Sequence, residues 1–381
     1  MRVLFITTSR SDYGILEPLL RKIKKDKFFQ TKILVTGEHN SKIHNKSKNL
    51  VLKNNKLNTS ILKISDREGS NPKDILKKSS IILSKIFYYL KSINPDIILL
   101  VGDRYETFLV SYASMVCRIP IAHLHGGEKT VASIDDAMRH SISKMANIHL
   151  VERLDYKRRL IQIGEDRSKI FVVGSLGREN INNTKLFSKK YLEKNLKFKF
   201  FDKNIIFTYH PETLNSDKIE KNIKIILKSI KNYNNIRFIF TSPNLDVGSN
   251  IIRKNIMKFI KNNSNAVYFP SLGSKKYFSV LKYSDGVIGN SSSAIIEVPF
   301  MKKFSINIGN RQKGRFTYSS VINIKNSSKE IKNAINLVYQ KKFSIKIKKN
   351  KVTLRKTSNK IVGILKKINL NKILFKEFVD L

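Results

Sequence analysis

Ile97-Ile-Leu-Leu-Val-Gly-Asp-Arg-Tyr-Glu106 joins a short apolar run to a charged turn. A second apolar run, Ile119 to Ala122, is followed by His123-Leu-His-Gly-Gly-Glu128. Short apolar runs that stop at turn residues are typical of strands buried on both faces of a parallel sheet. The sequence therefore predicts an α/β protein with an open, doubly wound parallel sheet.

Polar side chains gather where these predicted strands end. Ligands of an open parallel sheet bind outside the carboxyl ends of its strands. Several acidic and basic residues should converge on one cleft there: Asp103, Arg104, Glu106, His125, Glu128, Asp136 and His140. The chain has only 29 acidic residues, so several carboxylates in one region indicate acid–base chemistry rather than a solvated surface.

The net charge of +44, from 73 Lys and Arg against 29 Asp and Glu, admits two interpretations. A basic chain can bind nucleic acid or membrane phosphates. Here the lysines are spread over nearly every polar segment without interleaved aromatic stacking platforms, which favours a compositional bias over a dedicated nucleic-acid surface. We expect no specific nucleic-acid partner.

Length and apolar patterning limit the protein class. The chain of 381 residues is long enough for two domains. It lacks the roughly 18 consecutive apolar residues of a membrane helix, and its first residues predict a strand rather than a signal peptide. We expect a cytoplasmic protein without membrane insertion. The single cysteine, Cys117, excludes a disulfide framework and a cysteine metal site.

The amino-terminal region predicts a strand, a polar turn and a helix, at Arg2 to Thr7, Thr8 to Gly14 and Ile15 to Lys25. The turn lacks G-x-G-x-x-G, which argues against a nicotinamide dinucleotide. Arg10 and Asp12 in this turn fit either a binding site or a local salt bridge with a helix cap. Further on, Ser133 or Asp135 is expected to cap a helix through Lys144, with Asp136 and His140 one turn apart.

The chain predicts two α/β domains and a tail. We expect a first domain over 1–175, a linker with one helix over 176–203, a second domain over 204–350 and a helical tail over 351–381. The second domain repeats the pattern of strands that end in polar loops. The predicted tail helices, Ser328 to Tyr339 and Leu354 to Ile368, are expected to pack across both domains.

Gly289-Asn-Ser-Ser-Ser-Ala-Ile-Ile-Glu297 is the clearest anion-binding segment of the second half. A small-residue turn that opens a helix presents free backbone N–H groups, and three hydroxyls add donors, which suits a diphosphate. Glu297, about one and a half turns into that helix, fits either a contact to ribose hydroxyls or a buried cap. Three cationic residues in Arg311-Gln-Lys-Gly-Arg315 strengthen the anion-binding interpretation.

Seven separated motifs occur along the chain in one order: Ser9-Arg-Ser-Asp-Tyr13, Gly102-Asp-Arg-Tyr-Glu106, His123-Leu-His-Gly-Gly-Glu128, Asp135-Asp136 with Arg139-His140, His210-Pro211, Gly289-Asn-Ser-Ser-Ser293 with Glu297, and Gly309-Asn-Arg-Gln-Lys-Gly-Arg315. Together they resemble the bacterial hydrolysing UDP-N-acetylglucosamine 2-epimerases of sialic acid biosynthesis. The resemblance covers residues 1–320.

This resemblance implies two Rossmann-like domains in the glycosyltransferase-B arrangement, with UDP held mainly by the second. It implies conversion of UDP-N-acetylglucosamine and water to N-acetylmannosamine and UDP, through elimination to a glycal and hydration. No cofactor and no metal are implied, and relatives lead us to expect a homodimer or homotetramer. The alternatives are a 2-epimerase of a UDP- or GDP-linked 2,4-diacetamido-2,4,6-trideoxy sugar, as in legionaminic acid synthesis, and a polyanion-binding protein on a degenerate enzyme fold.

The resemblance also assigns residues to roles. The catalytic candidates are Asp103, Glu128, Asp135, Asp136 and His210. The candidates for binding UDP or the substrate are Arg10, Asp12, Arg104, Arg139, His140, Asn244, Ser291, Ser292, Ser293, Glu297, Arg311, Gln312 and Arg315. Many relatives carry Glu where this chain has His125, so Glu128 or Asp136 is expected to supply the carboxylate there.

Overall fold

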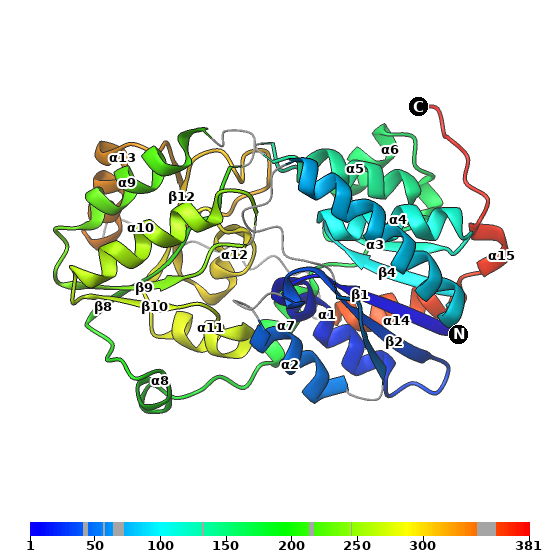
Figure 1. Cartoon of the computed structure of the whole chain (residues 1–381), viewed down its shortest axis with the longest axis horizontal. Coiled ribbons are helices and arrows are strands. Elements are labelled where there is room, and N and C mark those ends of the chain that lie inside the picture. The colour runs from blue at the N-terminus through cyan, green and yellow to red at the C-terminus, as the bar shows by residue number, and fades with distance from the viewer. Residues whose placement is uncertain are drawn as a thin grey trace.

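Two parallel α/β domains make up the computed structural model, which describes residues 1–40, 45–55, 58–63, 72–131, 133–212, 217–244, 246–340 and 356–381. Figure 1 shows the two domains side by side, and the last helices return to the domain that holds the amino terminus. The predicted fold class is confirmed. The predicted border between 350 and 351 lies outside the described residues.

The first domain is built on a seven-stranded sheet, ordered β3-β2-β1-β4-β5-β6-β7, with every strand pair parallel. The chain turns from one side of β1 to the other between β3 and β4, so the β1/β4 edge is a topological switch point. The strands are β1 Arg2–Thr7, β2 Gln30–Val35, β3 Thr59–Ile61, β4 Ile97–Val101, β5 Ile121–Leu124, β6 Ile148–Val151 and β7 Ile170–Val172.

The second domain repeats this order in a six-stranded parallel sheet, β10-β9-β8-β11-β12-β13. Its switch point lies between β8 and β11, where His210 and Asn290 follow the strands. The strands are β8 Lys203–Thr208, β9 Ile236–Thr241, β10 Ala266–Phe269, β11 Gly286–Gly289, β12 Phe304–Ile308 and β13 Val321–Ile324. The short strands β3 and β13 were not predicted, because alternating polar residues leave them without a continuous apolar run.

Helices cover both sheets. In the first domain they are α1 Arg10–Ile23, α2 Asn45–Asn55, α3 Pro72–Ile93, α4 Tyr105–Val116, α5 Asp135–Met145, α6 Leu154–Gln162, α7 Leu176–Asn183, α14 Thr357–Lys367 and α15 Leu370–Ile373, with 3₁₀ turns η1 Gly37–Asn40 and η3 Arg167–Lys169. The connecting and second-domain helices are α8 Lys189–Leu196, α9 Ile219–Ile230, α10 Ser249–Lys261, α11 Gly273–Lys282, α12 Ser292–Ile296 and α13 Ser328–Tyr339, with the 3₁₀ turn η5 Val298–Met301. None of the helices in the described part of the chain combines the length and the apolarity of a membrane span.

Two predicted helix starts are wrong. Helix α1 begins at Arg10 rather than Ile15, because the Ser9 hydroxyl accepts a hydrogen bond from the Asp12 N–H at 3.3 Å and caps the helix. Helix α5 begins at Asp135 without a side-chain cap. The Ser133 hydroxyl, outside the capping position, donates to the Asp135 carboxylate at 2.7 Å and accepts from the Asp135 N–H at 3.3 Å.

The linker and the tail also differ from the prediction. The region 176–203 contains two helices, α7 and α8, rather than one. The tail helices do not each pack across both domains. Ile331 and Ile335 of α13 lie in the core of the second domain, whereas Ile361 and Leu365 of α14 lie in the core of the first. The chain therefore crosses back to the first domain after α13.

We predict that Gly289→Ala destabilises the protein strongly. Gly289 ends β11 with φ of +139°, and a Cβ there would lie 1.8 Å from the backbone oxygen of Thr208 on the paired strand β8. The variant should lose at least ~2 kcal/mol of unfolding free energy, measured by urea denaturation. The control is Gly363→Ala in α14, where a Cβ meets nothing within 4 Å. It should gain about 0.5–1 kcal/mol, and equal losses in both variants would contradict the prediction.

Candidate functional site

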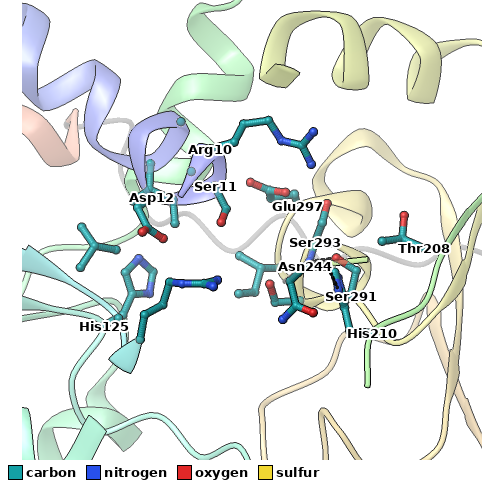
Figure 2. Close-up of a pocket in the computed structure, with 18 of the residues that line it drawn as sticks. Arg10, Ser11, Asp12, His125, Thr208, His210, Asn244, Ser291, Ser293 and Glu297 are labelled. Carbon is teal, nitrogen blue, oxygen red and sulfur yellow. Dashed lines mark hydrogen bonds between the residues drawn. The ribbon is translucent and has the colours of Figure 1, made fainter. Parts of the chain in front are cut away.

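An open cavity lies between the carboxyl ends of the two sheets. Its empty space, which includes the solvent at its mouth, is about 1850 Å³. Figure 2 shows its lining side chains, with Asp12 and His125 on the first-domain side and Thr208 and His210 on the other. Sixteen of the predicted site residues line it: Arg10, Asp12, Asp103, Arg104, Glu128, Asp135, Arg139, His210, Asn244, Ser291, Ser292, Ser293, Glu297, Arg311, Gln312 and Arg315.

Asp136 and His140 are not among the residues that line this cavity. The Asp136 carboxylate accepts a hydrogen bond from the Thr130 N–H and lies 3.8 Å from the His140 ring. Asp135 and Arg139 occupy the inward face of α5 at i and i+4. Asp136 and His140 are each one residue further on, which turns them by about 100° around the helix. The geometry therefore favours Asp135 over Asp136 as a group that meets a ligand.

The guanidinium of Arg139 is buried at the centre of the first-domain side. It donates to the Asp103 carboxylate, to the Thr130 hydroxyl at 2.9 Å and to the His125 backbone oxygen at 3.0 Å. Glu128 lies 3.4 Å away as a second anion. Burial alone would lower the pKa of Arg139, but these carboxylates raise it, so the guanidinium stays charged and fixes the ends of β4 and β5 together.

Glu128 is held by three partners. The His125 Nδ1 lies 2.7 Å from Oε1, while the guanidinium groups of Arg139 and Arg315 each lie 3.4 Å from Oε2. Burial raises the pKa of a carboxyl group, but His125, Arg315 and Arg139 together hold the pKa of Glu128 far below its usual range. Glu128 is therefore a fixed anion that accepts protons poorly.

Asp135 has the opposite character. Burial, with Asp103 and Asp246 nearby, raises its pKa to about 6. A carboxyl group with this pKa exchanges its proton near neutral pH, which suits a general acid or base. Asp103, Glu128 and Asp135 are thus three carboxylates in one cavity with different electrostatic surroundings.

Arg10 and Asp12 do not form the local salt bridge that was one alternative. Asp12 accepts hydrogen bonds from the hydroxyl and the N–H of Thr8, at 2.6 and 3.2 Å. Arg10 instead donates to the Ser271 hydroxyl of the second domain at 2.7 Å. The Arg10 side chain therefore spans the cavity between the two domains.

His210 on the second-domain side has a defined tautomer. The backbone N–H of Asn244 donates to His210 Nδ1 at 3.0 Å, so a neutral ring carries its proton on Nε2. Burial, assisted by Arg311, lowers the pKa of His210 well below its ordinary value. Asn290 also bonds the backbone N–H and oxygen of His210, at 2.7 and 2.9 Å. The ring is therefore a neutral and well-positioned donor.

Hydroxyl and cationic groups line the rest of this side. Ser293 hydrogen-bonds the Tyr277 hydroxyl at 2.9 Å, and Ser291 caps α12. Helix α12 ends at Ile296, so Glu297 caps its carboxyl end and does not lie inside the helix as predicted. Burial raises the pKa of Glu297. Arg311 donates to the Asn290 backbone oxygen at 3.3 Å.

Arg315 joins the two domains. It extends from the second domain and donates to the Lys129 backbone oxygen at 3.1 Å and to the Thr130 hydroxyl at 3.2 Å, besides pairing with Glu128. These first-domain acceptors occupy the guanidinium that was predicted to bind UDP or substrate. In this geometry the main role of Arg315 is to connect the second domain to the first.

Several lining residues had no predicted role. Glu38 follows β2 and binds the Arg104 guanidinium at 2.6 Å. Its position in Gly37-Glu-His, directly after a predicted strand, was a usable signal. Asp246 follows β9, two residues beyond the predicted Asn244. Tyr277 lies on α11, and no sequence motif marked it.

Comparison with known proteins gives the family. The model of the UDP-N-acetylglucosamine 2-epimerase family matches residues 21–366. The chain belongs to this family. The match includes every cavity-lining carboxylate of the first domain except Asp12, and the second-domain loops with His210 and Ser291.

Three known proteins illustrate the range of this 2-epimerase family. The GDP/UDP-N,N'-diacetylbacillosamine 2-epimerase (hydrolyzing) of Campylobacter jejuni is 36% identical over all of this chain and 99% of its own length. Polysialic acid biosynthesis protein P7 of Escherichia coli is also 36% identical, over 90% of this chain and 87% of its own length. The crystal structure of UDP-GlcNAc 2-epimerase from Neisseria meningitidis bound to UDP-GlcNAc shares the fold, with a TM-score of 0.77, 18% identity and coverage of 97% and 100%.

We predict that Asp135→Asn makes the protein more stable at pH 8 but not at pH 4. The raised pKa of Asp135 means that its stabilising, protonated form is complete below pH ~4 and is lost as the pH rises through about 6. An amide avoids that loss. From pH 4 to pH 8 the unfolding free energy of the variant relative to that of the wild type should therefore rise by roughly 2 kcal/mol, measured by urea denaturation.

Asp26→Asn provides the control of opposite sign. The Lys366 ammonium lowers the pKa of Asp26, so the aspartate stabilises above its unfolded pKa and the variant should lose stability at pH 8. Parallel stability curves for Asp135→Asn and the wild type would contradict the assigned surroundings of Asp135.

Proposed function

We propose that this protein is a hydrolysing 2-epimerase of a UDP- or GDP-linked 2,4-diacetamido-2,4,6-trideoxy sugar. The observation that carries the enzymatic part is the cavity, where carboxylates of the first domain face hydroxyl and cationic groups of the second. The choice of sugar is supported by the Campylobacter jejuni relative, whose similarity extends over the whole chain. A polyanion-binding role on a degenerate fold is not favoured, because the motifs form one assembled cavity.

The proposed reaction removes the C2 proton while the C1–O bond breaks and its electron pair leaves with the nucleoside diphosphate. This elimination gives a glycal with a C1=C2 double bond. Water then adds its hydroxyl to C1, and a proton is delivered to C2 from the opposite face. The sum is nucleotide sugar plus water to nucleoside diphosphate plus the 2-epimeric sugar, with no net oxidation.

The second domain is assigned to the diphosphate. Ser291, Ser292 and Ser293 supply hydroxyl donors, and Arg311 supplies positive charge. The Nε2–H of neutral His210 is a further donor to the departing phosphate oxygen. Donors that stabilise a leaving group as its charge develops lower the barrier to elimination.

The first domain is assigned to the sugar. Asp103 accepts from Arg139 and lines the cavity, so it is a candidate for the base that takes the C2 proton. Asp135 is the second candidate for proton transfer because of its raised pKa. Arg104, held by Glu38 at 2.6 Å, adds positive charge beside them.

The second candidate function is hydrolysing epimerisation of UDP-N-acetylglucosamine. It is supported by the sequence resemblance to the epimerases of sialic acid biosynthesis, together with the Escherichia coli relative, whose name refers to polysialic acid biosynthesis and whose identity of 36% equals that of the Campylobacter relative. The expected homo-oligomer and the cytoplasmic location stay predictions.

The first experiment compares UDP-N,N'-diacetylbacillosamine, its GDP analogue and UDP-N-acetylglucosamine as substrates, by proton NMR in D2O. We expect release of the nucleoside diphosphate and a free sugar deuterated at C2, with kcat/KM at least tenfold higher for a diacetamido substrate. The reverse preference would select UDP-N-acetylglucosamine. Absence of nucleoside diphosphate release from all three would refute the proposal.

We further predict that Asp103→Asn abolishes turnover and spares UDP binding. Loss of the base should reduce kcat by at least ~100-fold, while the diphosphate contacts of the second domain remain. Isothermal titration calorimetry with UDP measures the second property. The contrasting variant is Ser292→Ala, which should weaken UDP binding more than Asp103→Asn does. A similar loss of UDP affinity in both variants would assign Asp103 to binding.

A further inference from the structure

His125 and Glu128 form a buried pair at the end of β5. His125 Nδ1 lies 2.7 Å from Glu128 Oε1, and the two side chains are 12% and 3% exposed. His125 has φ of +66°, in the left-handed region that non-glycine residues adopt rarely. Such backbone strain is concentrated at functional sites, where the surrounding structure enforces it.

The pair has a defined hydrogen-bond direction. Glu128 is kept ionised by Arg139 and Arg315, so its Oε1 accepts and His125 Nδ1 carries the hydrogen. Among the described residues, the hydrogen bond that His125 makes through its ring is the one from Nδ1 to Glu128, and none is found at Nε2. His125 lines the cavity, and Figure 2 shows it on the first-domain side, across from His210 and Asn244. Its free nitrogen is therefore the atom available to a bound sugar.

We propose that His125 is the acid that delivers the new proton to C2 during hydration, and that Glu128 is the residue that positions and charges it. This inference rests on the proposed function. The arrangement offers an imidazolium that is anchored through Nδ1. A carboxylate that anchors one imidazole nitrogen fixes the tautomer and stabilises the cationic form, as in hydrolase triads.

The step balances as follows. In elimination, a carboxylate takes the C2 proton and the nucleoside diphosphate leaves with the C1–O electron pair. In hydration, His125 Nε2 gives its proton to C2 of the glycal, on the face opposite the proton removed. Water bonds to C1 through oxygen, and its released proton returns to Nε2. The proton from the first step passes from the carboxylate to solvent.

The charges around His125 agree with a cationic ring. Glu128 comes from the loop after β5, Glu152 from the end of β6 and Glu297 from the end of α12, whereas Arg139 of α5 is the opposing positive charge. Burial lowers the pKa of His125, but Glu128 outweighs it and raises the pKa above the ordinary value. The imidazolium is thus available at neutral pH.

The test uses His125→Asn, because asparagine tolerates the left-handed conformation and cannot transfer a proton at neutral pH. With the substrate that the wild type turns over fastest, UDP or GDP release should stay within tenfold of the wild type. Formation of the free sugar should fall by at least ~100-fold, and the glycal should accumulate, seen by NMR as its vinyl H1 signal. Calorimetry with UDP serves as the folding control.

Glu128→Gln tests the positioning role. The amide oxygen can still accept from Nδ1, but the negative charge is lost, so the pKa of His125 should fall. The alkaline limb of the pH profile for sugar formation should then shift to lower pH by about one unit or more. A residue with only a structural role would reduce the rate at every pH without moving this limb.

Three results would overturn the inference. In the first, His125→Asn makes the free sugar at the wild-type rate. In the second, nucleotide release and sugar formation fall together in His125→Asn with no glycal. In the third, the limb does not move in Glu128→Gln. In each of these the wild type still epimerises its substrate, so the proposed function stands. A wild type that releases no nucleoside diphosphate would overturn both.

Discussion

The buried guanidinium of Arg139 is the interaction on which the cavity depends. It reaches from α5 to Asp103 after β4 and to the backbone of His125 after β5, and it lies beside Glu128. A buried cation is tolerated only when it is paired and hydrogen-bonded. The same pairing fixes the loops after β4 and β5 against helix α5 in one geometry. Removing this side chain would deprive the Asp103 carboxylate of its hydrogen-bonded cation and Glu128 of one of its three cationic neighbours.

Arg315 extends this network across the cavity. Its contacts to Glu128 and Thr130 tie the loop after β12 to the loop after β5, while Arg10 reaches Ser271 in the reverse direction. The two sheets therefore face each other across these polar contacts. Contacts of this kind are compatible with relative domain movement, because interfaces between domains resemble transient ones.

The cavity carboxylates differ in their electrostatic surroundings and therefore in how readily they take up a proton. Glu128 is ionised by three neighbouring cationic groups, whereas Asp135 keeps a pKa of about 6. His210, on the opposite side, is neutral, whereas Glu128 favours a charged His125. Separated pKa values of neighbouring groups are how one site provides both acid and base at a single pH.

The sequence by itself determined the two parallel sheets and most of the cavity lining. Apolar runs such as Ile97–Val101 stop at polar residues, and the carboxyl ends of parallel strands share one edge, so Asp103 and Ser291 could be placed without coordinates. Only the tertiary structure showed that Asp135, not Asp136, faces the cavity, because a rotation of about 100° separates neighbouring helix residues. Only the tertiary structure showed that Arg315 pairs with Glu128, since contacts between distant segments leave no periodic pattern in the sequence. It also gave His125 its partner, which depends on a left-handed backbone that sequence pattern does not report.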